Sequence, residues 1–279
     1  MDLGLENKVA LVAGGSSGLG LAVARELAAE GAHVAIGARD RDRLAAAERA
    51  LKEVARGRVA AASVDVSDPD AARRWVDEVA ADLGALHIVL VSGGSPPAGH
   101  ASQFEPGDYQ AAIGSVVLPA VSVALAALPH LRAARWGRVL FVTSETASVP
   151  IPSLAISGLA RAGIARFAQA LAAEAGRDGV TVNVLAPSAT RTEMVQRAAA
   201  RLAELVPETG DAEAHMRAMG QHNAIGRIAR PDEFAALAAF LASERASFIT
   251  GGVHLIDGGA SVMGPELPHF TNAPRDTYT

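Results

Sequence analysis

Cysteine is absent from this 279-residue sequence, and aromatic residues make up only 4% of it. The absence of cysteine excludes disulfides, thiolate metal ligands and a cysteine nucleophile, and it agrees with a reducing, cytoplasmic location. Half of the residues are hydrophobic, so a core with few aromatic rings must consist of Ala, Val, Leu and Ile. A core of that kind favours helices packed on a parallel sheet, whose strands are unbroken aliphatic runs.

A surplus of basic residues is also missing. The formal net charge is −5, which gives no positive field for nucleic acid or an anionic membrane, and we expect neither as a partner. The first six residues are acidic where a signal peptide would be basic. The eight histidines show neither HxxxH nor HExxH spacing, so no metal site is expected. The run 93–95 does not form a GxSxG nucleophile elbow, which excludes a hydrolase of that design.

One stretch, 110–128, has no charged residue and is long enough to span a bilayer. It contains Ser115, Pro119 and Ser122, and strand patterns flank it on both sides. These features favour a buried helix of an α/β fold over a membrane span.

Short aliphatic runs alternate with longer helical patterns along nearly the whole chain, which predicts a doubly wound Rossmann fold. We expect one seven-stranded parallel sheet with helices on both faces, formed by a single domain over 1–262. Residues 188–224 interrupt the alternation and are predicted to be a substrate lid. Residues 263–279 are predicted to be a C-terminal extension. The expected strands are 9–13, 33–38, 59–64, 87–92, 138–143, 180–185 and 253–256. The expected helices are 19–30, 41–55, 69–83, 108–134, 158–177 and 231–242.

A glycine-rich turn lies between the first expected strand and the first expected helix. Gly14, Gly18 and Gly20 have the spacing GxxxGxG, and Ser16, Ser17 and Leu19 fill the turn. Such glycines allow backbone N–H groups to approach a pyrophosphate at the helix N-terminus. Because the motif stands directly between strand and helix, it predicts a dinucleotide site.

This spacing resembles the short-chain dehydrogenase/reductase family, and the resemblance continues in order along the chain. Asp65-Val66 is similar to the family's adenine-contacting pair, and Ser92-Gly93-Gly94 takes the place of its Asn-Ala-Gly motif. Thr143-Ser144 ends a strand where the family has its catalytic serine, and a segment containing Pro187 and Thr192 resembles the one that closes over nicotinamide. The resemblance implies the following cofactor-binding residues: Gly14, Ser16, Ser17, Gly18, Leu19, Gly20, Arg39, Asp65, Val66, Ser92, Gly93, Gly94, Arg161, Pro187 and Thr192.

The tip of the second strand decides which nucleotide is expected. NAD enzymes place an acidic residue there for the ribose hydroxyls, whereas NADP enzymes use a nearby arginine. Arg39 occupies the tip, and Asp40 reads as the N-cap of the next helix. NADP(H) is therefore favoured, with NAD(H) as the alternative.

The catalytic positions depart from the family pattern. The family has a tyrosine thirteen residues after the serine and a lysine four residues later; here these positions hold Ser157 and Arg161. The asparagine position on the preceding long helix falls at Ser115. The resemblance thus implies a catalytic set of Ser144, Ser157, Arg161 and Ser115, in which only Ser144 is unchanged. A loop of the Gly-Gly-x-Pro-Pro type at 93–97 and Ser-x-x-x-Arg together resemble a divergent branch of the family.

These replacements leave three functions open. The first is an NADP(H)-dependent oxidoreductase acting on a small carbonyl or alcohol, with a proton from an ordered water, Glu145 or His100. The second is a non-redox lyase, isomerase or cyclase on the same scaffold, and the third is a nucleotide-binding regulator without turnover. We also expect a homo-oligomer, a tetramer or dimer, because the Ala-rich helices 108–134 and 158–177 pair between subunits in the family.

Overall fold

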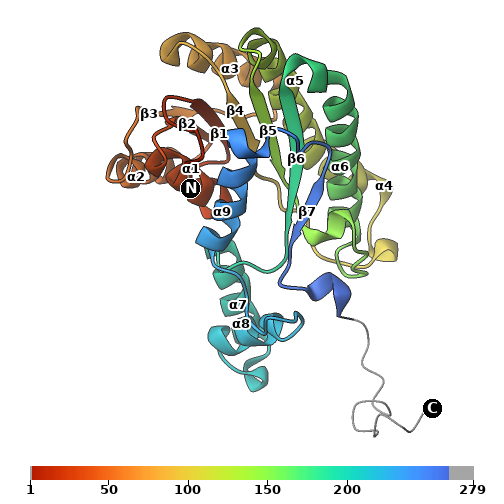
Figure 1. The fold of residues 1–279 in the computed structure, drawn as a ribbon. Helices are drawn as coiled ribbons and strands as arrows, with labels where there is room; N and C mark the ends of the chain where they lie inside the picture. The colour runs from red at the N-terminus through yellow and green to blue at the C-terminus, as the bar shows by residue number, and fades with distance from the viewer. Residues whose placement is uncertain (1, 264–279) are drawn as a thin grey trace, which may run out of the picture.

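The computed structural model describes residues 2–263 and contains a seven-stranded sheet in the order β3-β2-β1-β4-β5-β6-β7 (Figure 1). Every neighbouring pair of strands is parallel, so the predicted sheet is confirmed. Except for Met263, the expected C-terminal extension lies outside the described residues. The strands are β1 (Val9–Ala13), β2 (His33–Ala38), β3 (Val59–Ser63), β4 (Ile88–Val91), β5 (Gly137–Val142), β6 (Val180–Pro187) and β7 (Val253–Ile256).

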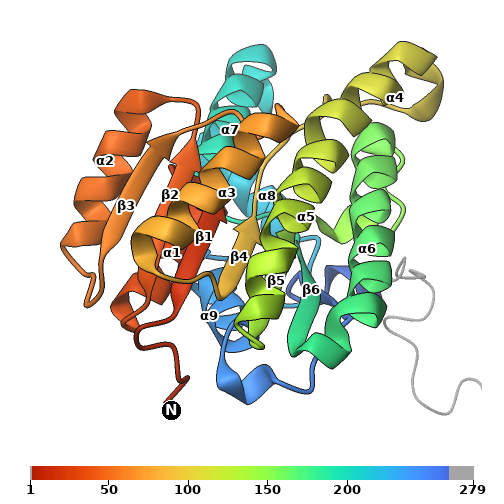
Figure 2. The same ribbon diagram turned by 90° about the horizontal axis from the view of Figure 1, so that it is seen from above.

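Helices cover both faces of this sheet. On one face α3, α5 and α6 lie side by side, as Figure 2 shows, and α1, α2 and α9 cover the other. Along the central strand β1, alternate residues enter the two cores: Leu11 packs with the first set of helices and Val12 with the second. The helices are α1 (Gly18–Ala29), α2 (Arg41–Lys52), α3 (Pro69–Leu83), α4 (Pro106–Ala112), α5 (Leu118–Ala133), α6 (Ala155–Ala175), α7 (Glu193–Leu205), α8 (Ala212–Gly220) and α9 (Pro231–Leu241).

The long uncharged stretch is a core helix, as predicted. Its residues Val123 and Ala127 are buried in the core that α5 forms with β4, β5 and α3. The single helix expected over 108–134 is in fact interrupted by a π-helical turn over Ile113–Val117. A run of small and aliphatic residues contains no residue type that marks such a turn, so it could not be predicted from the sequence.

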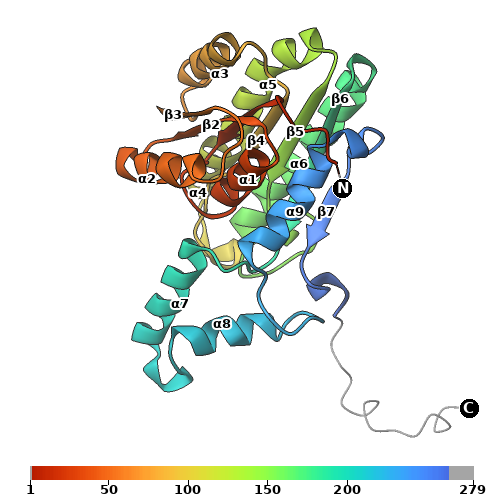
Figure 3. The same ribbon diagram turned by 60° about the vertical axis from the view of Figure 1, so that its left-hand side comes forward.

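Two helices leave the sheet near the carboxyl ends of its strands. α7 and α8 form a hairpin that projects away from the sheet (Figures 1 and 3), within the segment expected to be a lid. Ala199 and Met216 of the hairpin form a small hydrophobic cluster with Ile228, in the segment after α8, separate from the two main cores. We call residues 193–220 the α7–α8 hairpin.

Candidate active site

A pocket of about 430 Å³ lies at the carboxyl ends of β1, β4, β5 and β6. In the strand order, β1 is the point where the chain reverses direction across the sheet, which is where ligands bind in open α/β folds. Thirteen of the predicted site residues line this one pocket. They are Gly14, Ser16, Ser17, Gly18, Leu19, Ser92, Gly93, Gly94, Ser144, Ser157, Arg161, Pro187 and Thr192.

The glycine turn has no room for side chains. Gly14 has a φ of +78°, and a Cβ built there would lie 1.9 Å from the carbonyl oxygen of Ser92. A Cβ on Gly20 would lie 2.2 Å from the carbonyl oxygen of Gly14, a backbone atom that cannot turn aside. Gly20 does not line the pocket. Its lack of a side chain lets the first turn of α1 pack directly against the backbone of the glycine turn.

The N-terminus of α1 lacks the side-chain cap that the next two helices have. Its N-cap residue, Ser17, makes no side-chain capping bond, whereas Asp40 caps α2 and Asp68 caps α3. Backbone N–H groups at the start of a helix attract an anion, and those of α1 face the pocket beside Ser16 and Gly18. This cradle of glycine turn and uncapped N–H groups supplies the positive field and the donors that a diphosphate group requires.

The tip of β2 carries the residues expected to choose the nucleotide. Arg39 is exposed and lies outside the pocket lining. Asp40 accepts hydrogen bonds from the N–H groups of Asp42 (3.1 Å) and Arg43 (3.0 Å), which confirms it as an N-cap. The Asp65 carboxylate accepts two bonds from Ser67, and these, with the charge of Arg39, lower its pKa. The Asp40 carboxylate is thus engaged as the cap of α2 and lies 3.7 Å from Nε of Arg43, and Arg39 is the cation that directly follows β2.

Ser144 and Ser157 both face the pocket, from the end of β5 and the first turn of α6. The Ser144 hydroxyl accepts a long bond of 3.4 Å from the Thr146 N–H, so its own proton is available to a ligand. Leu154, Ser95 and Pro96 complete this end of the pocket. Two small hydroxyls thus occupy the space where a phenol would otherwise stand.

Arg161 is buried beneath these serines, and no carboxylate within residues 2–263 pairs with it. Its Nη1 donates to the carbonyl oxygens of Gly93 (3.2 Å) and Val142 (3.3 Å), and its Nη2 donates to Gly94 (2.5 Å). Its Nε is buried without a hydrogen bond. Burial lowers the pKa of the guanidinium to about 10, so the group is charged at neutral pH. The side chain ties the loop after β4 to the end of β5.

Replacing Arg161 with Met is expected to lower the free energy of unfolding by about 2 kcal/mol, because three carbonyls lose charged donors. Amide hydrogen exchange around Gly93 and Gly94 should rise at the same time. The matched control is Arg166→Met on the exposed face of α6, which should change stability by less than about 0.5 kcal/mol. Equal effects of the two substitutions in urea unfolding would contradict this role.

Other residues considered for catalysis lie outside the pocket lining. The exposed hydroxyl of Ser115 donates to the carbonyl oxygen of Ala111 (2.8 Å) within the π-helical region. His100 is exposed in the loop after β4, and its backbone N–H donates to Gln103. Glu145 follows Ser144 but is half-buried on the side facing Asp257. None of these three side chains reaches the cavity that holds Ser144 and Ser157.

Glu145 gives stability a pH dependence. Burial raises the pKa of its carboxyl, and the charge of Asp257 raises it further. The folded state therefore favours the protonated form, so this stabilisation is complete below the ordinary pKa of 4.5 and is lost as pH rises through the raised pKa. Glu145→Gln should melt at a higher temperature than the unsubstituted chain at neutral pH, and the gap should close in acid. A constant gap across this range in thermal scans would refute the assignment.

The sequence did not point to two charged residues of the pocket. Glu193 and Arg197 line it from the first turns of α7, beside Met194. Their spacing of four residues is ordinary for an ion pair on an exposed helix, so nothing in the sequence separated them from solvent-facing charges. Met194 is 54% exposed and borders the pocket.

Comparison with known proteins agrees with this geometry. A family model described as enoyl-(acyl carrier protein) reductase matches residues 13–261. Versicolorin reductase stcU from Emericella nidulans is 32% identical over 262 residues, which cover 92% of this chain and 96% of that protein. Meso-2,3-butanediol dehydrogenase from Serratia marcescens is 30% identical over 256 residues, covering 92% and 95%.

A solved structure shows the same fold. L-Sorbose reductase from Gluconobacter frateurii, complexed with NADPH and L-sorbose, superposes with a TM-score of 0.89 at 32% identity, covering 95% of this chain and 100% of that one. The sheet order, the glycine cradle and the match over 13–261 lead to one conclusion. The chain belongs to the short-chain dehydrogenase/reductase family of NAD(P)-dependent oxidoreductases, which act on alcohols and carbonyls.

Proposed function

We propose that this protein is an NADP(H)-dependent oxidoreductase of small carbonyl or alcohol substrates that uses hydroxyls and a buried guanidinium in place of the family's phenol and lysine. One observation carries the proposal: the diphosphate cradle and Ser144, Ser157 and Arg161 line the same pocket. A nucleotide held by the cradle and a substrate held by the serines would therefore share one cavity.

The residues present fit a dinucleotide in distinct ways. The N–H groups at the start of α1 would bind the diphosphate, and Arg39 would pair with a 2′-phosphate. Pro187 and Thr192, at the end of β6 and the N-cap of α7, would cover the nicotinamide side. When bound, the cofactor would supply or accept a hydride.

The proton must come from a group other than a tuned phenol. An aliphatic hydroxyl is too weak an acid to donate a proton by itself at neutral pH. We infer that Ser144 and Ser157 hold a water against the substrate oxygen and that this water relays a proton from bulk solvent, gaining one proton as it gives one up, while the charge of Arg161 stabilises negative charge developing there. Glu145 and His100 are less suited to the task, since neither lines the pocket.

A nucleotide-binding protein without turnover is the second candidate. It is favoured by the arrangement of Arg161, whose two terminal nitrogens donate to backbone carbonyls instead of facing a ribose or substrate. A non-redox lyase, isomerase or cyclase remains the third, and it would need acid–base groups in the pocket.

A deuterium-transfer experiment separates these candidates. The protein is incubated with NADPH deuterated at the transferable position and a panel of aldehydes and ketones, and the products are analysed by mass spectrometry. The proposal predicts a product carrying one deuterium, and much less of it with Ser144→Ala. Tight NADPH binding with no labelled product across the panel would favour the second candidate instead.

The outer faces of α5 and α6 support a homo-oligomer. Leu118, Leu125 and Leu159 are about half exposed there (53%, 50% and 46%). We expect gel filtration to give a dimer or tetramer, and Leu125→Glu to shift it toward the monomer because a charge would be buried in the interface. A monomer for the unsubstituted chain would remove this part of the proposal.

A further inference from the structure

One carboxylate in the α7–α8 hairpin is shared by two arginines from different parts of the fold. Oε1 of Glu193 accepts a bond from Nη1 of Arg197, four residues later on α7, at 2.8 Å. The same oxygen accepts a bond from Nη2 of Arg43, on the first turn of α2. The pair between Arg43 and Glu193 therefore joins the hairpin to the element that follows the tip of β2.

This ion pair lies at the rim of the nucleotide cradle. Glu193 and Arg197 line the pocket together with Ser17 and Gly18. Thr192, the N-cap of α7, lies so close to the glycine turn that a Cβ on Gly18 would be 3.7 Å from its methyl carbon. The start of α7 thus crosses the mouth of the site, and Arg43 approaches it from the side of Arg39.

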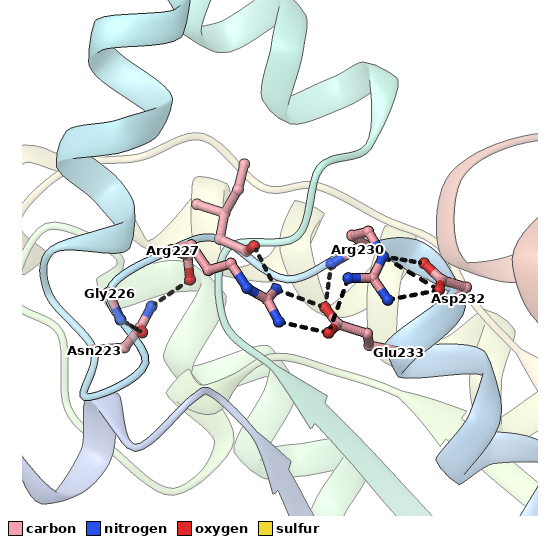
Figure 4. A network of polar contacts seen from close by, with 7 residues as sticks. Asn223, Gly226, Arg227, Arg230, Asp232 and Glu233 are labelled. Carbon is pink, nitrogen blue, oxygen red and sulfur yellow. Dashed lines mark hydrogen bonds and ion pairs between the residues drawn. The ribbon is translucent and has the colours of Figure 1, made fainter.

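The position of the hairpin depends on the connections at its two ends. Its buried residues Ala199 and Met216 pack with Ile228, in the segment after α8, and belong to neither of the two sheet cores. The segment that leaves α8 is firmly fixed, as Figure 4 shows: Arg227 donates to both carboxylate oxygens of Glu233 on α9 (2.8 and 2.7 Å). Asn223 holds the same segment through bonds with Gly226 and Arg227. The chain before α7 is held by a bridge between Thr190 and Ala229, whereas the link from the first turn of α7 to α2 is an exposed ion pair.

Exposed ion pairs are weak, and a phosphate is a stronger partner for arginine than a carboxylate. The side chains of Arg43 and Glu193 are 37% and 48% exposed, so their attraction competes with water and salt. A phosphate monoester carries roughly −1.5 to −2 charges at neutral pH and can accept a bidentate guanidinium. Arg43 is four residues past Arg39, at the same strand tip where a 2′-phosphate would be read.

We propose that Arg43 is shared between hairpin and cofactor: it pairs with Glu193 when no 2′-phosphate is present and turns to the 2′-phosphate when NADP(H) is bound, which releases α7 from α2. This inference rests on the proposed NADP(H) binding. It makes Glu193 a competitor of the cofactor's phosphate, and it couples the choice of cofactor to the position of the hairpin.

The competition predicts opposite effects of two substitutions. Glu193→Gln removes the competing charge and should tighten NADPH binding by about two- to fivefold, as expected for the loss of an exposed ion pair. Arg43→Gln removes the phosphate's partner and should weaken NADPH binding by roughly tenfold. Neither substitution should change the affinity for NADH, which lacks the 2′-phosphate.

The test is a fluorescence titration of the full chain with NADPH and with NADH. Two controls remove a like charge from the same helices without touching the shared pair. Glu204→Gln breaks an ion pair with Arg201 on α7, and Lys52→Gln breaks one with Glu48 on α2. Both controls should bind the two nucleotides as the unsubstituted chain does.

Hydrogen exchange supplies a readout that does not depend on affinity or activity. At saturating nucleotide, the first-turn amides of α7 should exchange faster with NADPH than with NADH, and Arg43→Gln should remove this difference. If the unsubstituted chain binds neither nucleotide, the proposed function fails. A preference of the unsubstituted chain for NADPH, together with an affinity for NADPH that Glu193→Gln leaves unchanged or weakens, is the other contrary result. That result would refute the sharing of Arg43 and leave the proposed function standing.

Discussion

Ser17→Asp is expected to weaken NADPH binding on the order of 100-fold, while the protein stays as stable as before or gains up to about 1 kcal/mol. The two effects oppose each other because of where Ser17 stands. It is the N-cap of α1 and makes no capping bond, so an aspartate there can cap the helix and complement its dipole. The same carboxylate would place a negative charge where the diphosphate is expected to lie.

Ser17→Asn is the matched control, because an asparagine caps a helix equally well without the charge. It should retain most of the NADPH affinity. Titration by fluorescence and thermal unfolding by circular dichroism measure the two quantities independently. Unchanged NADPH affinity in Ser17→Asp would mean that the N-terminus of α1 is not the diphosphate site.

The second large effect is expected for Ser157→Tyr, which should raise the turnover of a carbonyl substrate by about 100-fold. Ser157 lines the pocket on the first turn of α6, and Arg161 lies one turn further along the same helix. A phenol at this position would be a far better acid than a serine hydroxyl or a water, and the guanidinium charge would lower its pKa further.

Ser157→Phe separates acid chemistry from the effect of filling the pocket. It introduces a ring of the same size without the hydroxyl, so it should give no gain in turnover. Steady-state kinetics with NADPH and a substrate found by the deuterium-transfer panel measure both variants. A fall in turnover for both, with NADPH affinity intact, would show that the pocket needs the space around Ser157 and would favour non-redox chemistry.

The sheet could be predicted from the sequence because its signals are local. β1, β2 and β7 have the predicted limits, since each is a short aliphatic run bounded by turn residues. The glycine turn could be predicted too, because its spacing places glycines where the backbone leaves no room for a side chain, as at Gly14 and Gly20. Helix limits were less accurate: α6 begins at Ala155 instead of 158, in a run of small residues that gives no clear start.

The chemistry of the site could be predicted only in part. The sequence placed Ser144, Ser157 and Arg161 together, but it could not show where the guanidinium points. The Arg161 partners Gly94 and Val142 lie 67 and 19 residues away, in the loop after β4 and at the end of β5. The pair between Arg43 and Glu193 joins positions 150 residues apart. Interactions of this kind depend on how the finished elements meet, and a single sequence does not record that.

The most direct test of the account is equilibrium titration of the purified protein with NADPH and NADH. The glycine cradle, the uncapped N-terminus of α1 and the cations after β2 predict saturable binding of one NADPH per chain, tighter than that of NADH. Failure to bind either nucleotide, or NADH binding the more tightly of the two, would contradict it.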